Sequence, residues 1–409
     1  MAQVTALIDA NNFYASCEQS LDPALIGRPV VVLSNNDGCI VARSAEARAL
    51  GIAMGTPYFK AKQTLERCGV VVRSSNYALY ADMSQRLMSL LESQVEELEV
   101  YSIDEAFARI SRPAAADLRP WGRQLRALVR RNLGLPIAIG LGASKGQAKL
   151  ANRLAKVEAS HAGLFDLGHC SHQDRWLETI AIEDVWGIGR KLADWCRLRG
   201  VRNARELRDM ASGPLRAKAG VVGLRLQREL QGHACLPLDL APSPKQETCV
   251  SRSFSRPITS LAELREAVAT YVVRAAEKLR KQQQRAASLS VYTRTSPFAP
   301  GFYSRSASIH LDLPSNDTKT LLNAALPLVE RIFQPHRQLA KAGVLMEHLQ
   351  DTEQLQHHLL VPCSAAHLQR RDTLMNTIDG LNRRYGRGTV QWAACGLHSG
   401  WSMRRERLG

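Results

Sequence analysis

Three carboxylates in two separate stretches of this sequence have the types and positions to act together. Asp9 follows an apolar segment at residues 4–8, and Asp104 and Glu105 follow another at residues 98–103. If the two segments are neighbouring strands, the three side chains meet at one edge of a sheet. Carboxylates this close raise each other's pKa, and hard divalent cations such as Mg²⁺ relieve the repulsion by binding their oxygens. Two such ions about 4 Å apart form a centre for in-line phosphoryl transfer.

Either stretch by itself is weak evidence for such a centre. A single aspartate at the end of a strand usually caps a helix or stabilises a turn. The turn Ser102–Glu105 alone is no more specific, so the interpretation depends on the elements that surround both stretches.

The first 170 residues alternate strand-like and helix-like segments, which favours a sheet with helices packed on it. Residues 34–38, Ser-Asn-Asn-Asp-Gly, have the chemistry of a hairpin turn. We expect strands at residues 4–8, 29–33, 39–42, 98–103 and 136–141, and helices at residues 11–19, 44–50, 77–98 and 146–157.

The second half of the chain has a different pattern. Residues 172–232 are typical of short helices with tight turns, and three prolines then mark a linker. The order after the linker is β-α-β-β-α-β, a compact unit that leaves one face of its sheet open. We expect its strands at residues 247–254, 288–293, 306–311 and 342–348, its helices at 261–283 and 318–333, and a loosely packed tail from residue 350.

Composition limits the possible functions. A chain of 409 residues exceeds what one hydrophobic core usually serves, so we expect two to four domains. The net charge of +16 favours a polyanionic partner, because Lys and Arg release counterions from phosphates; a generically basic protein is the alternative. Nine scattered cysteines without a Cys-x-x-Cys pair suit reduced thiols. No apolar run could span a bilayer and no secretion signal is evident, so we expect a cytoplasmic protein.

Two motifs resemble those of a known family. Residues 9–18, Asp-Ala-Asn-Asn-Phe-Tyr-Ala-Ser-Cys-Glu, resemble the opening motif of the Y-family translesion DNA polymerases, and residues 101–107, Tyr-Ser-Ile-Asp-Glu-Ala-Phe, resemble their second catalytic motif. The resemblance covers residues 4–349 well and the tail more weakly. Within the family it is greatest to the UmuC branch, the catalytic subunits of bacterial DNA polymerase V, in residues 30–40, 74–84, 184–190 and 275–280.

The resemblance implies an α/β (α+β multidomain) fold shaped like a right hand. The palm would take residues 1–29 and 74–166, and the small fingers residues 30–73. A thumb with a helix-hairpin-helix-like turn would take residues 167–235, followed by a linker at 236–246. The β-α-β-β-α-β unit at 247–349 would be the DNA-binding little finger, and residues 350–409 a tail with possible partner contacts.

The resemblance also assigns roles in the catalytic centre. Asp9, Asp104 and Glu105 would be the ligands of two Mg²⁺ ions, with the backbone carbonyl of Ala10 as a fourth ligand. One ion would lower the pKa of a primer 3′-hydroxyl, and the other would hold the triphosphate.

Four further residues match nucleotide-binding positions of the family. Arg48 and Lys156 would neutralise the triphosphate; the alternative is a surface charge on a helix. Tyr14 matches the steric gate that leaves no room for a 2′-hydroxyl, and Phe13 would support the same pocket. For Tyr14 the alternative is ordinary core packing.

DNA contacts are expected outside the palm. In the thumb, Gly187, Ile188 and Gly189 resemble a hairpin whose backbone N–H groups approach a phosphate. In the little finger, charges on a strand and a long helix would bind phosphates, or else face solvent: Arg252, Arg274, Lys278 and Arg280. In the tail, Gln356, Leu359 and Leu360 could form a degenerate sliding-clamp peptide, or pack as ordinary core.

Taken together, these features predict an error-prone DNA-directed DNA polymerase that copies damaged templates in the SOS response. Ala45 and Ala47 would line a finger helix that puts little bulk over the nascent base pair. The resemblance implies primer–template DNA, dNTP, a processed UmuD dimer, the RecA filament and the sliding clamp as partners. The alternatives are a nucleotide cyclase on a similar palm and a non-catalytic DNA-binding or scaffold protein with a degenerate palm.

Overall fold

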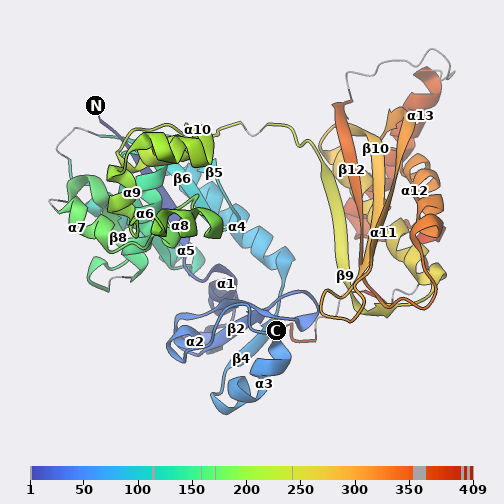
Figure 1. Cartoon of the computed structure of the whole chain (residues 1–409). Coiled ribbons are helices and arrows are strands. Elements are labelled where there is room, and N and C mark those ends of the chain that lie inside the picture. The colour runs from blue at the N-terminus through green and yellow to red at the C-terminus, as the bar shows by residue number, and fades with distance from the viewer. Residues whose placement is uncertain are drawn as a thin grey trace. The chain divides into compact units, whose positions relative to one another are not determined.

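The computed structural model describes residues 2–112, 116–157, 159–170, 172–241, 243–352, 365–397, 400–402 and 406–408. The chain forms two compact units (Figure 1). The first comprises Met1–Ser34, Gly38–Pro242 and Arg407–Gly409, and the second comprises Asn35–Asp37 and Ser243–Glu406. In the described ranges no helix is both long and apolar enough to cross a membrane.

A five-stranded sheet forms the centre of the first unit. Strand β1 lies in its middle and pairs antiparallel with β6 on one side and β7 on the other. The predicted strand at 98–103 was wrong in one respect: β5 ends at Val100, and β6, which begins at Glu105, is the strand that pairs with β1. The strand order is β5 (Glu97–Val100), β6 (Glu105–Arg112), β1 (Ala2–Ala10), β7 (Ile137–Gly142) and β8 (Leu164–Asp166).

Alternation along β1 divides this sheet into two faces. Val4, Ala6 and Ile8 are buried in one apolar cluster with residues of α1 (Phe13–Leu21), α4 (Tyr77–Glu92) and α5 (Arg119–Leu133). Leu7 and its cross-strand partner Phe107 lie on the opposite face, where they pack with Ala148 of α6 (Lys145–Val157). Odd-numbered residues near the end of β1 therefore lie on the α6 side.

Glycines in β7 let α6 lie very close to the sheet. A Cβ at Gly140 would collide with the backbone nitrogen of Asn152 and the backbone oxygen of Ala148. The Asn152 amide donates to the carbonyl of Ala138 at 2.9 Å, which ties the helix to the same strand. The height of α6 above the sheet is thus set by backbone packing.

A second, three-stranded sheet lies between β1 and α4 in sequence. Its order is β3 (Ile40–Arg43), β2 (Val30–Leu33) and β4 (Val71–Ser74), with helices α2 (Ala45–Ala49) and α3 (Tyr58–Arg67). Ala47 is fully buried with Val31 and Leu33, so the expectation that it lines a nucleotide-facing surface was wrong. Ala45 is exposed.

Helices follow the five-stranded sheet. They are α7 (Gln173–Glu178), α8 (Arg190–Arg197), α9 (Ala204–Asp209) and α10 (Ser212–Leu230). Glu229 of α10 is fully buried and accepts hydrogen bonds from the backbone N–H of Gly146 at 2.8 Å and of Leu236 at 3.0 Å. These bonds fix α10 to the start of α6 and hold the beginning of the predicted linker.

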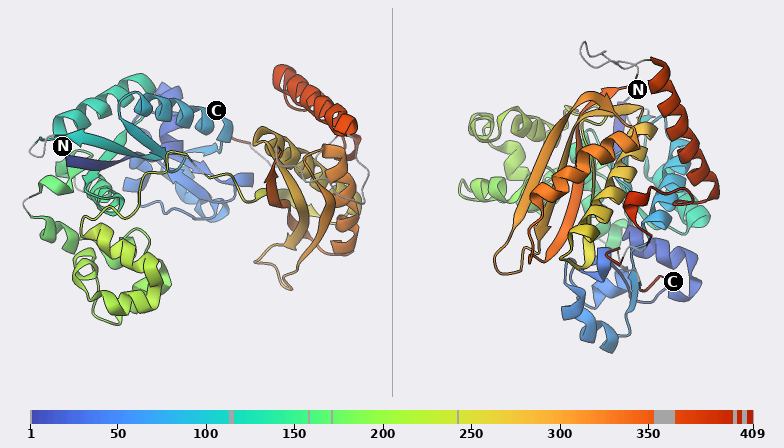
Figure 2. Two further views of the ribbon diagram at one scale, coloured as in Figure 1. Left: turned by 90° about the horizontal axis from the view of Figure 1, so that it is seen from above. Right: turned by 90° about the vertical axis from the view of Figure 1, so that its right-hand side faces the viewer.

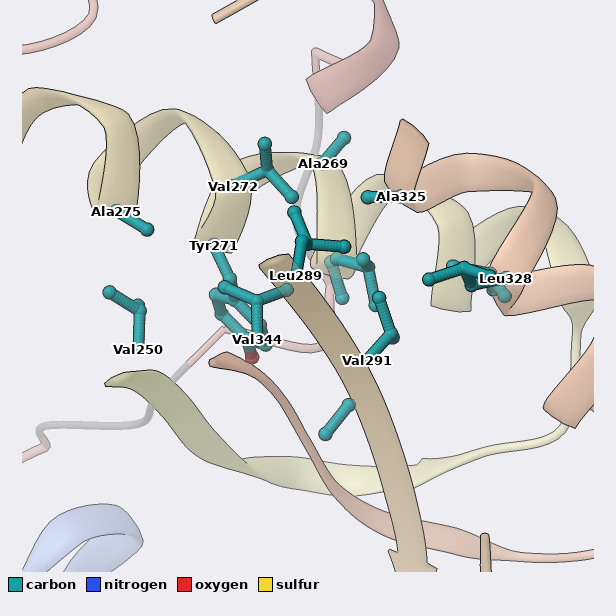
Figure 3. Packing of buried hydrophobic residues seen from close by; sticks show 14 of the residues in the cluster. Val250, Ala269, Tyr271, Val272, Ala275, Leu289, Val291, Ala325, Leu328 and Val344 are labelled. Atoms are coloured by element: carbon teal, nitrogen blue, oxygen red, sulfur yellow. The ribbon is translucent and has the colours of Figure 1, made fainter. Parts of the chain in front are cut away.

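The second unit has the β-α-β-β-α-β order that the sequence indicates. Its antiparallel sheet has the order β11 (Ser304–Ser315), β10 (Gln284–Thr295), β12 (Leu339–Asp351) and β9 (Thr248–Ile258). Helices α11 (Leu261–Lys281) and α12 (Thr318–Ile332) cover one face, where Tyr271, Leu289, Val291, Leu328 and Val344 pack together (Figure 3).

Described residues of the tail between 365 and 402 pack on this second unit, and for them the expectation of loose packing was wrong. Trp401 is buried, with its ring 5.9 Å from that of Tyr271 and 6.3 Å from that of Phe254. Helix α13 (Ala365–Tyr385) carries Asp379, whose carboxylate forms two hydrogen bonds with Arg280 of α11, at 2.6 and 2.8 Å. The sequence did not indicate these contacts because the partners lie about 100 or more positions apart.

We predict that Gly140→Ala destabilises the first unit. The added methyl forces α6 away from β7, and overpacking of this kind costs about 1–3 kcal/mol of unfolding free energy. Urea unfolding measures the change. At Gly213 an added Cβ would meet no described atom within 4 Å, so Gly213→Ala is the matched control. Equal stability of the two variants would show that α6 is not held this closely.

Candidate active site

Asp9, Asp104 and Glu105 are backbone neighbours because β1 and β6 are antiparallel. The end of β1 lies beside the beginning of β6, and Asp9 is the cross-strand partner of Glu105. The backbone N–H of Ala10 donates to the carbonyl of Asp104 at 2.8 Å, which fixes the turn that carries Asp104. The structure therefore brings Asp9, Ala10, Asp104 and Glu105 together at one sheet edge.

Helix α6 places lysines against these carboxylates. Lys156 Nζ lies 2.6 Å from Asp9 Oδ1, and Lys149 Nζ lies 2.7 Å from Glu105 Oε2. The two lysines are seven residues apart, about two helical turns, so they extend from the same side of the helix. The sequence had assigned Lys156 to the triphosphate; the role of Lys149 was missed, although its spacing from Lys156 was the available signal.

Burial and mutual repulsion govern the charge of Asp9. The pKa of Asp9 is raised to about 6, mainly by desolvation; Lys156 opposes this rise, and the charges of Asp104 and Glu105 add to it. Asp104 is oriented by the Ser102 hydroxyl, which donates to Asp104 Oδ1 at 2.7 Å. Ser102 is a second contributor that the sequence interpretation missed.

The carboxylates are held by protein donors in this structure. Among the described residues, no three His, Cys, Asp or Glu side chains converge into a ready metal site. The chemistry of the donor set still fits Mg²⁺, which prefers carboxylate and carbonyl oxygens.

Tyr14 lies in an aromatic group beside the carboxylates. Its ring stacks on that of Tyr80 at 4.2 Å and meets Tyr77 edge-on at 6.0 Å. Burial raises the pKa of the Tyr14 hydroxyl, and the charges of Tyr77 and Asp104 add to the effect. Tyr14 is half-buried, whereas Phe13 belongs to the core.

The other predicted residues of the first unit lie on helices or turns. Arg48 is exposed in α2. Gly187 has φ +87°, which favours glycine, and Gly189 is the N-cap of α8 with open space where a Cβ would lie. Ile188 is a core residue whose N–H donates to the carbonyl of Val185, so its side chain and N–H are already used within the protein.

Three of the four predicted cations of the second unit form an exposed basic cluster. Although both residues are exposed, partial desolvation by the surrounding protein lowers the pKa of Arg274 and of Lys278, and the neighbouring charge of Arg252 lowers both further. Like charges kept this close favour a polyanionic partner. Arg280 is different: its side chain is 9% exposed and bound to Asp379, Asn316 and Thr318, so its assignment to DNA is withdrawn.

The face of the sheet opposite α11 and α12 carries residues that the sequence interpretation did not assign. Leu289 and Val291 face the helices, so alternation places Ser290, Tyr292 and Arg294 on the other face. Arg294 pairs across strands with Ser304 and Lys341, and Tyr292 with Ser306 and Gly343. This face is polar and basic.

The predicted clamp residues Gln356, Leu359 and Leu360 lie outside the described residues.

Sequence families match most of the chain. Residues 8–153 match the impB/mucB/samB family, and residues 245–359 match the C-terminal domain of that family. Residues 372–409 match a domain of unknown function.

The chain is also similar to individual proteins. It is 42% identical to protein UmuC of Salmonella typhimurium over 407 residues, which cover 98% of this chain and 96% of that protein. Protein SamB of Salmonella typhimurium is 38% identical over the same shares. DNA polymerase IV of Corynebacterium diphtheriae is 30% identical over 76% of this chain and 68% of that protein.

Solved structures confirm the fold. A Y-family DNA polymerase chimaera of Dbh and Dpo4 matches with a TM-score of 0.67 at 18% identity, over 85% of this chain and 99% of that one. The insertion ternary complex of Dbh DNA polymerase matches with a TM-score of 0.55 at 18% identity, over 84% and 98%.

We predict that replacing Arg252, Arg274 and Lys278 together with alanine weakens binding to duplex DNA of any sequence. In a plot of the logarithm of the DNA-binding constant against the logarithm of the salt concentration, each lost phosphate contact should reduce the magnitude of the slope by about 0.9. Fluorescence anisotropy at several salt concentrations measures the slope. Arg280→Gln is the control, because it should lower the melting temperature of the second unit and leave the slope unchanged. If the salt dependence changed only in Arg280→Gln, Arg280 and not the basic cluster would be the residue that contacts DNA.

Proposed function

The chain belongs to the impB/mucB/samB family of UmuC-like, Y-family DNA polymerases, and we propose that it copies damaged templates with a catalytic centre built on Asp9, Asp104 and Glu105. It is a DNA-directed DNA polymerase, and its substrates are primer–template DNA and dNTP. The observation that supports this centre best is the meeting of the three carboxylates at the edge shared by β1 and β6.

Two Mg²⁺ ions held by these carboxylates and the Ala10 carbonyl would activate the primer 3′-hydroxyl and neutralise charge on the triphosphate and the leaving pyrophosphate. The protein's part is to bind and orient. Lys149 and Lys156 already offset the negative charge of Glu105 and Asp9, which lets the carboxylates share a half-buried edge.

Nucleotide selection is proposed for the residues next to this edge. Lys156 lies at the carboxylates and would also contact the triphosphate, while Arg48 would reach it from α2. The Tyr14 ring would exclude a 2′-hydroxyl, since stacking on Tyr80 keeps it from turning away. Phe13 supports this ring from the core.

DNA would be held by both units. Gly187 and Gly189 would let the backbone before α8 approach a phosphate. The buried side chain of Ile188 would anchor this turn to the core. The basic cluster of Arg252, Arg274 and Lys278 would bind phosphates in the second unit. We also propose the division into palm, fingers, thumb and little finger at the boundaries given above.

We also propose a cellular context and protein partners for the polymerase, which its likeness to UmuC supports. The polymerase would act in the cytoplasm during the SOS response, with a processed UmuD dimer, the RecA filament and the sliding clamp as partners. Gln356, Leu359 and Leu360 would provide the clamp contact. Primer extension on an abasic template, with and without these partners, tests this setting.

The alternative is a non-catalytic DNA-binding or scaffold protein with a degenerate palm. The intact carboxylates and their two lysines argue against it, because buried charges are costly to keep without a use. Primer extension with and without Mg²⁺ separates the two possibilities, since only the polymerase produces metal-dependent extension.

We predict that Asp104→Ala reduces nucleotide insertion to background while DNA affinity stays within about twofold. The change removes a proposed metal ligand and no cation that meets DNA. Single-turnover insertion and DNA-binding assays measure the two effects. Asp82→Ala, at an exposed carboxylate paired with Arg86 on α4, is the control and should insert normally. Substantial extension by Asp104→Ala would contradict the assignment of the centre.

We predict that Tyr14→Ala raises ribonucleotide incorporation by at least about tenfold relative to deoxynucleotide incorporation, equivalent to about 1.4 kcal/mol of lost discrimination. Tyr14→Phe keeps the ring and should retain the preference. The ratio of rNTP to dNTP insertion efficiencies is the measurement. An unchanged ratio in Tyr14→Ala would mean that Tyr14 serves only packing.

A further inference from the structure

Three aromatic rings surround the ammonium group of Lys149. Its Nζ lies 4.5 Å from the ring centre of Tyr101, 5.6 Å from that of Phe107 and 5.8 Å from that of Trp186. All three distances are within the range of attractive cation–π contacts. We call this arrangement the aromatic cage. The same Nζ lies 2.7 Å from Glu105 Oε2, so the cage holds the lysine that holds a catalytic carboxylate.

The rings of the cage also hold one another. Tyr101 meets Phe107 edge-on at 5.3 Å and Trp186 edge-on at 6.0 Å, and Phe107 lies 6.1 Å from Trp186. The indole N–H of Trp186 donates to the Tyr101 hydroxyl at 3.3 Å. These separations suit paired aromatic rings. The cage is therefore closed by contacts among its own members.

The cage joins two parts of the first unit that are distant in sequence. Tyr101 and Phe107 flank the proposed metal ligands, one before and one after them in the chain. Trp186 comes from the segment just before Gly187 and α8. Among the described residues, Trp186 is not part of the apolar cluster that packs α8 and α10, whereas the nearby Trp195 is. Trp186 thus faces the carboxylate edge of the five-stranded sheet.

A caged lysine orients its partner better than a free one. Lysine has a flexible four-carbon stem and loses rotational freedom when it forms an ion pair. Here the rings confine the ammonium group, and the Lys149 and Glu105 side chains are only 16% and 18% exposed. Groups that hold a metal ligand from outside usually change metal affinity about 10–100-fold when removed.

We propose that Trp186 is a positioning residue of the metal site: it closes the aromatic cage on Lys149 and so fixes the orientation of Glu105. The inference rests on the proposed function, because it takes Glu105 as a metal ligand. It assigns the segment before α8 a second task besides its proposed phosphate contact, since the geometry of the metal site depends on that segment being in place.

Binding of Mn²⁺, followed by electron paramagnetic resonance, tests the proposal without turnover. The full-length protein is assembled with primer–template DNA that has a dideoxy-terminated primer, together with the correct dNTP, and titrated with Mn²⁺. Trp186→Ala should weaken Mn²⁺ binding by up to about tenfold, the lower end of the range for removal of a direct partner of a metal ligand, because Trp186 acts through Lys149. Trp186→Phe keeps a ring in the cage and should stay close to the parent. Trp195→Ala, in which the lost indole stacks on Arg199 outside the cage, should bind Mn²⁺ normally.

Single-turnover insertion on an extendable primer provides the second measurement. Trp186→Ala should need more Mg²⁺ for half-maximal rate and recover at high Mg²⁺. Tyr101→Leu opens the same cage from the palm side and should have the same effect. The double variant should then be little worse than either single variant, because both remove one arrangement.

Parental Mn²⁺ binding and Mg²⁺ requirement in Trp186→Ala would overturn the proposal. Additive effects in the double variant, or a loss that follows the melting temperature or DNA affinity, would also overturn it, because each indicates general damage. Glu105→Gln separates this failure from that of the proposed function. If Glu105→Gln binds Mn²⁺ and inserts nucleotides like the parent, the catalytic assignment itself fails.

Discussion

The structure depends on one constraint: three carboxylates must share an edge that is partly removed from water. Side-chain alternation along β1 and β6 turns Asp9 and Glu105 toward α6, together with Leu7 and Phe107. That helix supplies the compensating charge through Lys149 and Lys156. Gly140 sets how close the helix can come, so a small residue in one strand controls the reach of cations on another element. In the second unit, helices α11 and α12 lie on one side of the four-stranded sheet, as two further views show (Figure 2).

Much of this centre could be predicted from sequence because its parts are local. The stretch at 101–107 and Asp9 with its following residues identified the carboxylates, and hydrophobic periodicity located most helices and strands. The pairing partner of β1 was misassigned, because the apolar segment before Asp104 is the stronger strand signal, while the true partner begins at Glu105 itself. Lys149 was seen only as a helix charge, since its ring partners come from two distant segments.

The second unit shows the same limit for charged residues. Four cations looked alike in sequence, yet Arg252, Arg274 and Lys278 remain exposed while Arg280 is bound by Asp379. What separates them is a carboxylate 99 positions away in α13, on a segment whose hydrophobic pattern is weak. A charge on an amphipathic helix therefore cannot be assigned to a ligand until the rest of the surface around it is known.

The burial of Trp401 has a consequence for how this chain can change over time. Residues 372–409 match a family description separate from that of residues 245–359, which suggests two modules. Yet Trp401 fills space beside Tyr271 and Phe254 in the preceding module, and Asp379 anchors Arg280 there. Recombination between relatives at the junction would separate the Trp401 indole from the Tyr271 and Phe254 rings that it packs against. The two modules should therefore be inherited together, and a substitution on one side of their contact should be accompanied by a substitution on the other side.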